Sequence, residues 1–167
     1  MANFLRFQMY KGSPVTISGD DPCIPDDLNE TTVRSITVAG DAWVVFDSLN
    51  YRGDFRIFRV GNQAFPSTLT SIQSVRMING GIDNSEITFY PHPFFRGTGE
   101  IFQSKAPQLQ EKYFSLKVTK GAVVFFDGEN YAGEKRILLN GDEVQNFTAV
   151  KLPSIGKSVK TARDMES

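Results

Sequence analysis

Short apolar runs, each only a few residues long, recur along the whole chain. Apolar and polar positions within them alternate with the period of a β-strand and not with that of a helix. Gly, Asn, Asp and Pro, the residues that favour turns, bound each run. The predicted strands are residues 43–47, 54–60, 86–90, 100–102, 122–126 and 135–139. The pattern predicts an all-β protein in which helix is limited to single turns in the loops 65–73, 105–114 and 147–154.

One spacing occurs four times in the sequence. A large apolar or aromatic residue is followed by an aromatic residue, then by glycine, and 18 to 25 residues after the glycine by serine. The four copies are Leu5, Tyr10, Gly12 and Ser35; Phe46, Tyr51, Gly53 and Ser74; Tyr90, Phe95, Gly97 and Ser115; and Phe126, Tyr131, Gly133 and Ser158. The second and fourth copies resemble each other most, so the order is A-B-A-B. This order predicts two modules, each built from two repeats.

Each position of the repeat has a structural interpretation. Glycine after an aromatic residue suits a hairpin tip whose backbone enters positive φ or lies against a ring. The earlier aromatic residue then folds over the tip, and the serine hydroxyl satisfies exposed backbone groups of the bent hairpin. Leu5 stands where the other copies have an aromatic residue, so we expect the first hairpin to be held less firmly.

The turn-rich segment NGGIDN at residues 79–84 marks the expected boundary between the modules. The expected modules are residues 1–82, with repeats 1–41 and 42–82, and residues 83–167, with repeats 83–120 and 121–162 and a tail at 163–167.

Composition excludes several classes of protein. The chain has 18 Lys and Arg against 19 Asp and Glu, so it lacks the basic surplus that nucleic-acid binding requires. Its hydrophobic content of 40% is enough to order a core. The sequence shows neither a membrane-spanning run nor a leader peptide, and the single cysteine, Cys23, suits a reducing compartment. We expect a cytoplasmic protein with neither a nucleic-acid nor a membrane partner.

Histidine and cysteine often form catalytic or metal sites in proteins, but in this chain they have structural interpretations. His92, the only histidine, stands between two prolines at a predicted hairpin tip and has no second histidine for a metal site. Cys23 lies in the acidic segment DDPCIPDD, where carboxylates disfavour a thiolate nucleophile. The prolines of that segment favour an extended, solvated loop that spreads its carboxylates apart. We therefore expect that the protein is not an enzyme.

The fourfold spacing resembles the repeat of the βγ-crystallins, and the resemblance covers residues 4–161. It implies two Greek-key β-sandwich domains of the βγ-crystallin type. It also implies a non-enzymatic structural or stress-related protein. Paired domains in this family associate either within one chain or between chains, and we expect pairing within the chain and a monomer.

Many βγ-crystallins bind Ca²⁺ through paired loops that carry Asn or Asp twice and then, after two residues, Ser or Thr before the repeat serine. The windows that end on the repeat serines here are ETTVRS, LTSIQS, QEKYFS and PSIGKS, and none has the full pattern. Arg34, Gln73, Phe114 and Lys157 occupy the hydroxyl position. Glu30 in the first window and Glu129 in the fourth hairpin are the remaining candidate ligands. The resemblance therefore implies at most weak calcium binding, and no required cofactor.

A recognition module, similar to small inhibitors or toxin subunits, is the alternative function, because a β-sandwich fold does not decide between the two. Such a module would use an exposed apolar anchor, and the loops 65–73 and 105–114 are its candidates.

Overall fold

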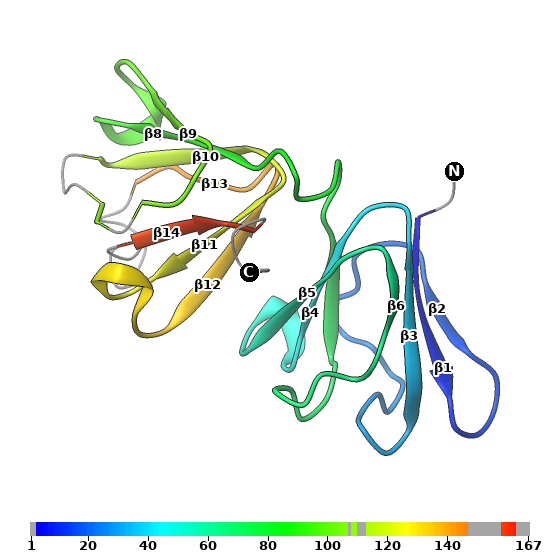
Figure 1. Cartoon of the computed structure of the whole chain (residues 1–167). Coiled ribbons are helices and arrows are strands. Elements are labelled where there is room, and N and C mark those ends of the chain that lie inside the picture. The colour runs from blue at the N-terminus through cyan, green and yellow to red at the C-terminus, as the bar shows by residue number, and fades with distance from the viewer. Residues whose placement is uncertain (1–2, 107, 110–112, 147–157, 163–167) are drawn as a thin grey trace. The chain divides into compact units, whose positions relative to one another are not determined.

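The computed structural model describes residues 3–106, 108–109, 113–146 and 158–162 (Figure 1). Contacts divide the chain into two units, Met1–Asn79 and Gly80–Ser167. Both consist of β-strands with short 3₁₀ turns, so the predicted all-β fold with two sandwich-like domains is confirmed.

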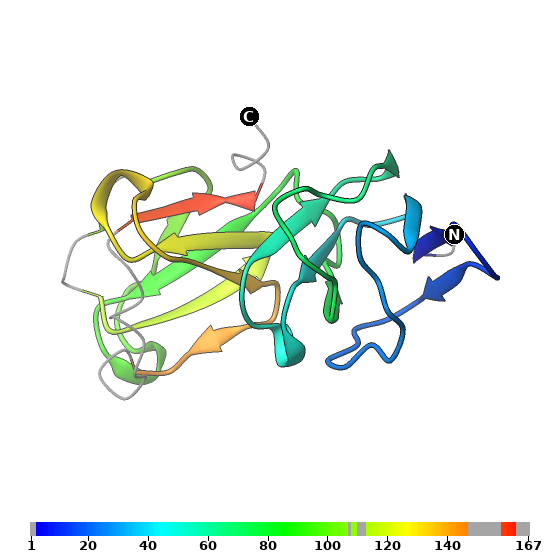
Figure 2. The same ribbon diagram turned by 90° about the horizontal axis from the view of Figure 1, so that it is seen from below.

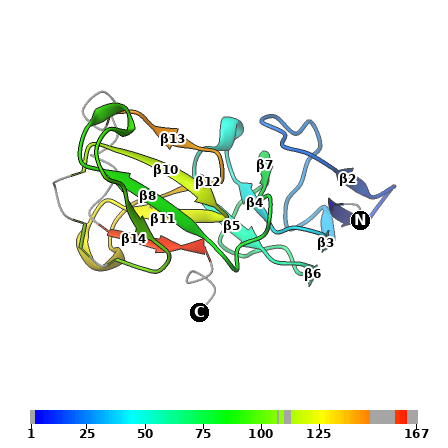
Figure 3. The ribbon, with the colours of Figure 1, turned by 90° about the horizontal axis from the view of Figure 1, so that it is seen from above.

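The first unit has two antiparallel sheets. One has the order β2-β1-β3-β6, and the other has the order β5-β4-β7. The strands are β1 (Phe4–Met9), β2 (Val15–Ile17), β3 (Val33–Ala39), β4 (Trp43–Phe46), β5 (Phe55–Phe58), β6 (Gly61–Gln63) and β7 (Ser74–Met77), with the 3₁₀ turn η1 (Leu49–Tyr51) after β4. Figure 3 shows this unit from above, with β2 to β7 labelled.

The second unit repeats this plan. Its sheets have the orders β13-β10-β8-β9 and β12-β11-β14. Its elements are β8 (Glu86–Tyr90), η2 (Pro93–Phe95), β9 (Glu100–Phe102), β10 (Ser115–Lys120), β11 (Ala122–Phe126), η3 (Glu129–Tyr131), β12 (Lys135–Leu139), β13 (Glu143–Val144) and β14 (Ser158–Thr161). Figure 2 shows its strands from below.

In each unit the two repeats exchange strands. β6 belongs to the second repeat but pairs with β3 of the first, and β13 of the fourth repeat pairs with β10 of the third. In return, Asp21 exchanges two hydrogen bonds of 3.0 Å with Val75 in β7. Ala106 does the same with Val159 in β14, at 2.8 and 3.0 Å. Because each repeat completes the sheet of the other, the pair of repeats is the unit that folds.

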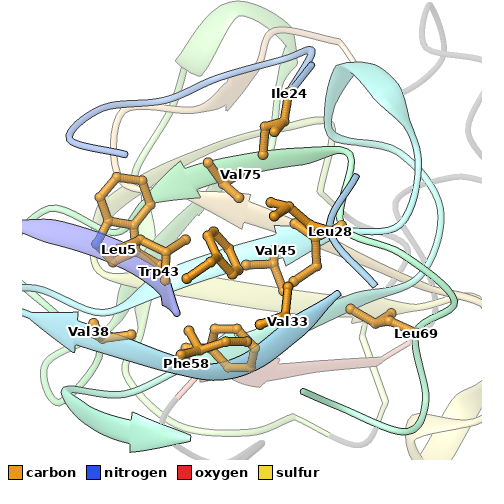
Figure 4. Packing of buried hydrophobic residues seen from close by; sticks show 13 residues of the cluster. Leu5, Ile24, Leu28, Val33, Val38, Trp43, Val45, Phe58, Leu69 and Val75 are labelled. Atoms are coloured by element: carbon orange, nitrogen blue, oxygen red, sulfur yellow. The ribbon is translucent and has the colours of Figure 1, made fainter. Parts of the chain in front are cut away.

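The core of the first unit lies between its two sheets. Alternation directs Trp43 and Val45 of β4 inward, where they meet side chains from β1, β3, β5 and β7 (Figure 4). Trp43 has no exposed surface. Its indole nitrogen is buried and finds no hydrogen-bond acceptor in the part of the chain that the structure describes.

An aromatic cluster dominates the core of the second unit. The Phe89 ring lies 4.9 Å from that of Tyr113 and 5.2 Å from that of Phe102, measured between centroids. The Tyr113 hydroxyl donates a hydrogen bond to the Glu100 carboxylate. Burial, reinforced by this carboxylate, raises the pKa of Tyr113 above its ordinary value. Tyr113 therefore stays neutral and keeps its donor proton.

Two local expectations need correction. The described residues of the loops 65–73 and 105–114 contain no helical turn; the 3₁₀ turns occupy hairpins instead, and residues 147–154 lie outside the described residues. The acidic segment is not a simple solvated loop, because Asp21 pairs with β7 as a strand residue does. Asp20 accepts a hydrogen bond of 2.7 Å from the Met77 amide. Backbone pairing at the sheet edge overrides the proline-rich composition.

Substitutions of Trp43 test the core of the first unit, in which this side chain is fully buried. Trp43→Ala should lower the free energy of unfolding of this unit by about 3–5 kcal/mol, because it leaves a cavity. Trp43→Phe should cost clearly less, since it keeps a ring and removes a buried, unpaired donor. Urea unfolding followed by far-UV circular dichroism measures both losses. Equal losses would contradict this expectation, because the retained ring would then recover none of the stability that the indole provides.

Candidate functional site

Three hairpins share an unusual backbone conformation. In each, the 3₁₀ turn contains two successive residues in the left-handed region, which disfavours residues other than glycine. The pairs, with their φ values, are Asn50 (59°) and Tyr51 (61°), Phe94 (60°) and Phe95 (62°), and Asn130 (56°) and Tyr131 (63°). A conformation of this kind persists only where surrounding contacts hold it.

A buried serine hydroxyl holds each of these hairpins. The Ser74 Oγ accepts a hydrogen bond of 3.0 Å from the Tyr51 amide and donates one of 2.6 Å to the Ser48 carbonyl. The Ser115 Oγ likewise accepts a hydrogen bond of 3.0 Å from the Phe95 amide and donates one of 2.7 Å to the His92 carbonyl. Ser158 joins Tyr131 to Gly128, also at 3.0 and 2.7 Å. Each hydroxyl thus satisfies one donor and one acceptor of the tip, and we call this arrangement the serine bridge.

Aromatic rings and a cation cover each bridged tip. The ring pairs Phe46 with Tyr51, Tyr90 with Phe95, and Phe126 with Tyr131 have centroids 5.7 to 5.8 Å apart. A basic side chain two positions after each bridging serine lies over the ring of the left-handed residue: Arg76 at 5.4 Å, Lys117 at 4.3 Å and Lys160 at 4.3 Å. The cation adds electrostatic attraction to the ring face.

The repeat glycines allow a close approach. At Gly53 and Gly133, both at positive φ, an added Cβ would overlap the carboxylates of Asp47 and Asp127. At Gly97 it would lie 2.7 Å from Pro91 Cγ. Any larger residue at these three glycines would both strain the backbone and displace the residue that closes the hairpin.

The first hairpin differs from the other three. Leu5 is buried in the core, whereas the Tyr10 side chain is 62% exposed. The Tyr10 amide donates to the Thr32 carbonyl at 3.1 Å, and Ser35 makes no serine bridge within the described residues. A bulge between β1 and β3 places Arg34 outside the regular pairing. The register also corrects the expectation for Leu5, which pairs with Val38. Gln8 lies opposite Ser35, whereas Phe46, Tyr90 and Phe126 lie opposite the bridging serines. Tyr10 therefore has no ring at this place to pack on.

Charged groups surround the tip of the second hairpin. A carboxylate oxygen of Asp20 lies 3.6 Å from Nε of Arg76, and the Arg76 guanidinium also lies over the Tyr51 ring. Partial burial raises the pKa of Tyr51, Asp20 raises it further, and Arg76 opposes both. The Tyr51 hydroxyl is therefore neutral at physiological pH and is not a candidate base.

The two expected calcium ligands lie in different units. Glu30 is exposed in the first unit, and Glu129 is exposed in the second, where its carboxylate accepts a 3.4 Å hydrogen bond from Gln108. At the hydroxyl position, Arg34 is exposed, Gln73 is half-buried and Phe114 is 37% exposed. Lys157, with most of the PSIGKS window, lies outside the described residues.

The described loops fit calcium poorly. Ca²⁺ takes six to eight oxygen ligands. Over residues 3–106, 108–109, 113–146 and 158–162, no group of three or more His, Cys, Asp or Glu side chains is placed to hold a metal ion. A guanidinium at position 34 adds a positive charge where a cation would bind.

The structure also places the remaining candidates from the sequence, namely His92, Cys23 and the loops 65–73 and 105–114. His92 is exposed and precedes η2, and its carbonyl accepts the Ser115 hydroxyl. Cys23 is exposed, with its amide bonded to the Asp21 carboxylate at 3.0 Å. In the loop 65–73, Leu69 and Ile72 are buried. The loop 105–114 buries Ala106 and Tyr113, so Phe114 alone among its described residues is an exposed large apolar side chain.

Sequence reasoning missed the cations over the rings. Their signal is present in the sequence, because the repeat serine is followed two positions later by Arg76, Lys117 or Lys160 in the three bridged repeats, and by Thr37 in the first. In a strand such a residue lies on the same face as the serine. A basic residue on a strand face is, however, more often simply solvated.

Comparison with known proteins agrees with the repeat pattern. Residues 6–78 match the family model for the Beta/Gamma crystallin domain. Human Beta-crystallin B1 is 30% identical over 149 residues, which cover 82% of this chain and 59% of the relative. Human Gamma-crystallin D is 25% identical over 142 residues, covering 80% of each chain. The human Beta/gamma crystallin domain-containing protein 1 is 26% identical, and the match covers 7% of its length. The chain thus spans less than two thirds of two of these three relatives.

Among solved structures, geodin, a beta-gamma crystallin from Geodia cydonium, aligns over 96% of this chain and 99% of its own, with a TM-score of 0.43 and 15% identity. Protein S, whose structure was solved in complex with calcium, aligns over 97% and 100%, with a TM-score of 0.39 and 17% identity. In the described part of this chain, no helix is both long and apolar enough to cross a membrane.

Removing a bridging hydroxyl should destabilise its unit. Ser74→Ala, Ser115→Ala and Ser158→Ala should each lower the free energy of unfolding by about 1–3 kcal/mol, because a buried donor and acceptor lose their partner. Ser35→Ala is the matched control, since Ser35 forms no such bridge in the described residues, and should have little effect. Thermal and urea unfolding measure the four variants. Equal losses at Ser35 and Ser74 would contradict the assignment.

Proposed function

Because this chain belongs to the βγ-crystallin family, we propose that it is a non-enzymatic structural or stress-related protein that serves through its own stability and solubility. The observation that carries the proposal is the serine bridge, present in three of the four repeats. Its hydrogen bonds, rings and cations all stabilise a hairpin tip.

The candidate reactive groups support the non-enzymatic part of the proposal. His92 contributes its backbone carbonyl to the hairpin, where it accepts the Ser115 hydroxyl. The lone thiol also suits the cytoplasm, where disulfides are rare.

We propose further that calcium binding is at most weak and is not required for folding. Glu30 and Glu129 each supply one exposed carboxylate to a loop region of their own unit. Hydrophobic cores and serine bridges already stabilise both units through residues of this chain alone. A weakly bound ion adds stability only in proportion to its occupancy of the folded state.

Each unit also has a buried apolar pair on the sheet face that points away from its core cluster. Val44 of β4 pairs with Ile57 of β5, on the face opposite Trp43 and Val45. Val124 of β11 pairs with Ile137 of β12, on the face opposite Val123 and Phe125. Apolar surface of this kind is more stable when covered. We propose that the two modules pair within one chain, which is then a monomer.

Thermal unfolding with Ca²⁺ and with a chelator tests the calcium part. Millimolar Ca²⁺ should raise the midpoint slightly, because the ion binds the folded state in preference to the unfolded one. Glu30→Gln should remove the contribution of the first unit and Glu129→Gln that of the second. Identical midpoints with Ca²⁺ and chelator would contradict calcium binding and leave the structural role untouched.

Separating the modules tests the pairing. The whole chain should sediment as a monomer of 18.6 kDa. Residues 1–82 and 83–167 made separately should each melt below the corresponding transition of the whole chain, since the outward apolar faces are then exposed to water. Val44→Asp should have a similar effect in the whole chain, and Arg56→Asp, at an exposed position of β5, is its control. A dimeric whole chain, or separate modules that melt at unchanged temperatures, would contradict intramolecular pairing.

A further inference from the structure

The hairpin between β1 and β2 ends in a tip that is open to solvent (Figure 1). Residues 10–14 of this tip, Tyr-Lys-Gly-Ser-Pro, are all exposed. Within the described part of the chain, their one hydrogen bond runs from the Tyr10 amide to the Thr32 carbonyl, at 3.1 Å. A Cβ added to Gly12, which has a φ of +89°, would meet no atom within 4 Å. Few contacts therefore oppose a local opening of this tip.

A basic residue followed by glycine occurs at the same place in three of the four tips. These pairs are Lys11–Gly12, Arg52–Gly53 and Arg96–Gly97, and all three basic residues are exposed. Ser74 and Ser115 form serine bridges in the second and third tips. The three pairs thus share their residue types and their exposure, and they differ in how firmly the backbone around them is held.

This difference matters to an endopeptidase, which binds several residues on each side of the bond that it cuts. A folded loop has to open locally before it can be bound in this way. In the second tip, opening breaks both hydrogen bonds of Ser74 and separates the packed rings of Phe46 and Tyr51. In the first tip, opening residues 10–14 breaks one hydrogen bond among those of the described residues. Exposed tips of small and polar residues are also preferred sites of proteolytic cleavage.

We propose that the bond between Lys11 and Gly12 is a site of limited proteolysis by a serine protease that recognises basic residues through a carboxylate in its specificity pocket. The step is a hydrolysis that consumes one water molecule. The bond from the Lys11 carbonyl carbon to the Gly12 nitrogen breaks, and the water oxygen bonds to that carbon. Lys11 then ends in a carboxylate, and Gly12 begins with an amine. The cut requires neither the proposed structural function nor calcium.

The strand that precedes the cut should stay in place. β1 lies between two partners, since its residues pair with Val15–Ile17 of β2 on one side and with β3 on the other. Leu5 and Phe7 of β1 have no exposed surface. Apolar burial and two ladders of backbone hydrogen bonds therefore hold this strand without a covalent link. Once the link is cut, unfolding of the first unit releases two molecules, so its midpoint should depend on protein concentration.

Brief treatment of the full chain with a small amount of trypsin at neutral pH tests the site, with denaturing electrophoresis and mass spectrometry as the readout. Cleavage after Lys11 should be at least about tenfold faster than cleavage after Arg52 or Arg96, because the bridged tips open less often. Lys11→Gln should abolish the fast cut. Size-exclusion chromatography of the cut protein should recover both fragments together in buffer and separately in urea.

Ala132→Lys is the matched variant. It gives the fourth tip the same Tyr-Lys-Gly sequence as the first, at an exposed position of a hairpin that Ser158 bridges. The introduced lysine should resist cleavage as Arg96 does. Ser74→Ala removes the bridge of the second tip and should speed cleavage after Arg52 severalfold.

Three outcomes would overturn the proposal. The first is cleavage after Arg52 or Arg96 as fast as after Lys11. The second is fast cleavage at the lysine of the Ala132→Lys variant, which would show that sequence and exposure decide the site and that the serine bridge does not. The third is loss of the β1 fragment from the cut protein in buffer without urea.

Discussion

The serine hydroxyl that bridges each of three hairpins is the contact on which the rest of the hairpin depends. Two left-handed residues in succession are unfavourable. The second of them in each hairpin is aromatic, and its ring must turn back over the tip. The hydroxyl stabilises this geometry through two hydrogen bonds. It accepts one from the amide of the second left-handed residue and donates the other to the carbonyl three residues earlier. Ring pairing and the basic residue over the ring then act on a tip already fixed in place.

The first repeat shows how the elements of this arrangement depend on one another. It keeps glycine and serine but has leucine at position 5, and the left-handed pair, the ring pair and the cation are all missing there in the described residues. Its strand still forms, because Leu5 and Phe7 are buried in the core. The sheet and the tip are therefore separately encoded: apolar alternation specifies the strands, and the serine bridge specifies the hairpin end.

Much of this could be predicted from the chain itself. Short apolar runs bounded by turn residues located strands such as β4 and β11. The fixed spacing singled out Ser74, Ser115 and Ser158, because local patterns record local conformation. The pairing of Asp21 with Val75 could not be predicted, since it joins residues far apart in sequence and runs through a segment whose prolines and acids favour a loop. Nor could the position of Lys160 over Tyr131, because a basic residue on a strand usually faces water. Calcium binding depends on ligand geometry, which the degenerate windows do not encode.

The exchange of strands between repeats also orders events during synthesis. The sheet that begins with β1 is completed only by β6, and Asp21 finds its partner only when Val75 exists. When only the first repeat has emerged from the ribosome, two of its backbone edges still lack their partner strands. Such unpaired edges are prone to pair wrongly. These long-range pairings make folding slow relative to local structure formation. The nascent first unit must therefore remain incomplete until β7 has emerged, and the same wait recurs in the second unit until β14 is made.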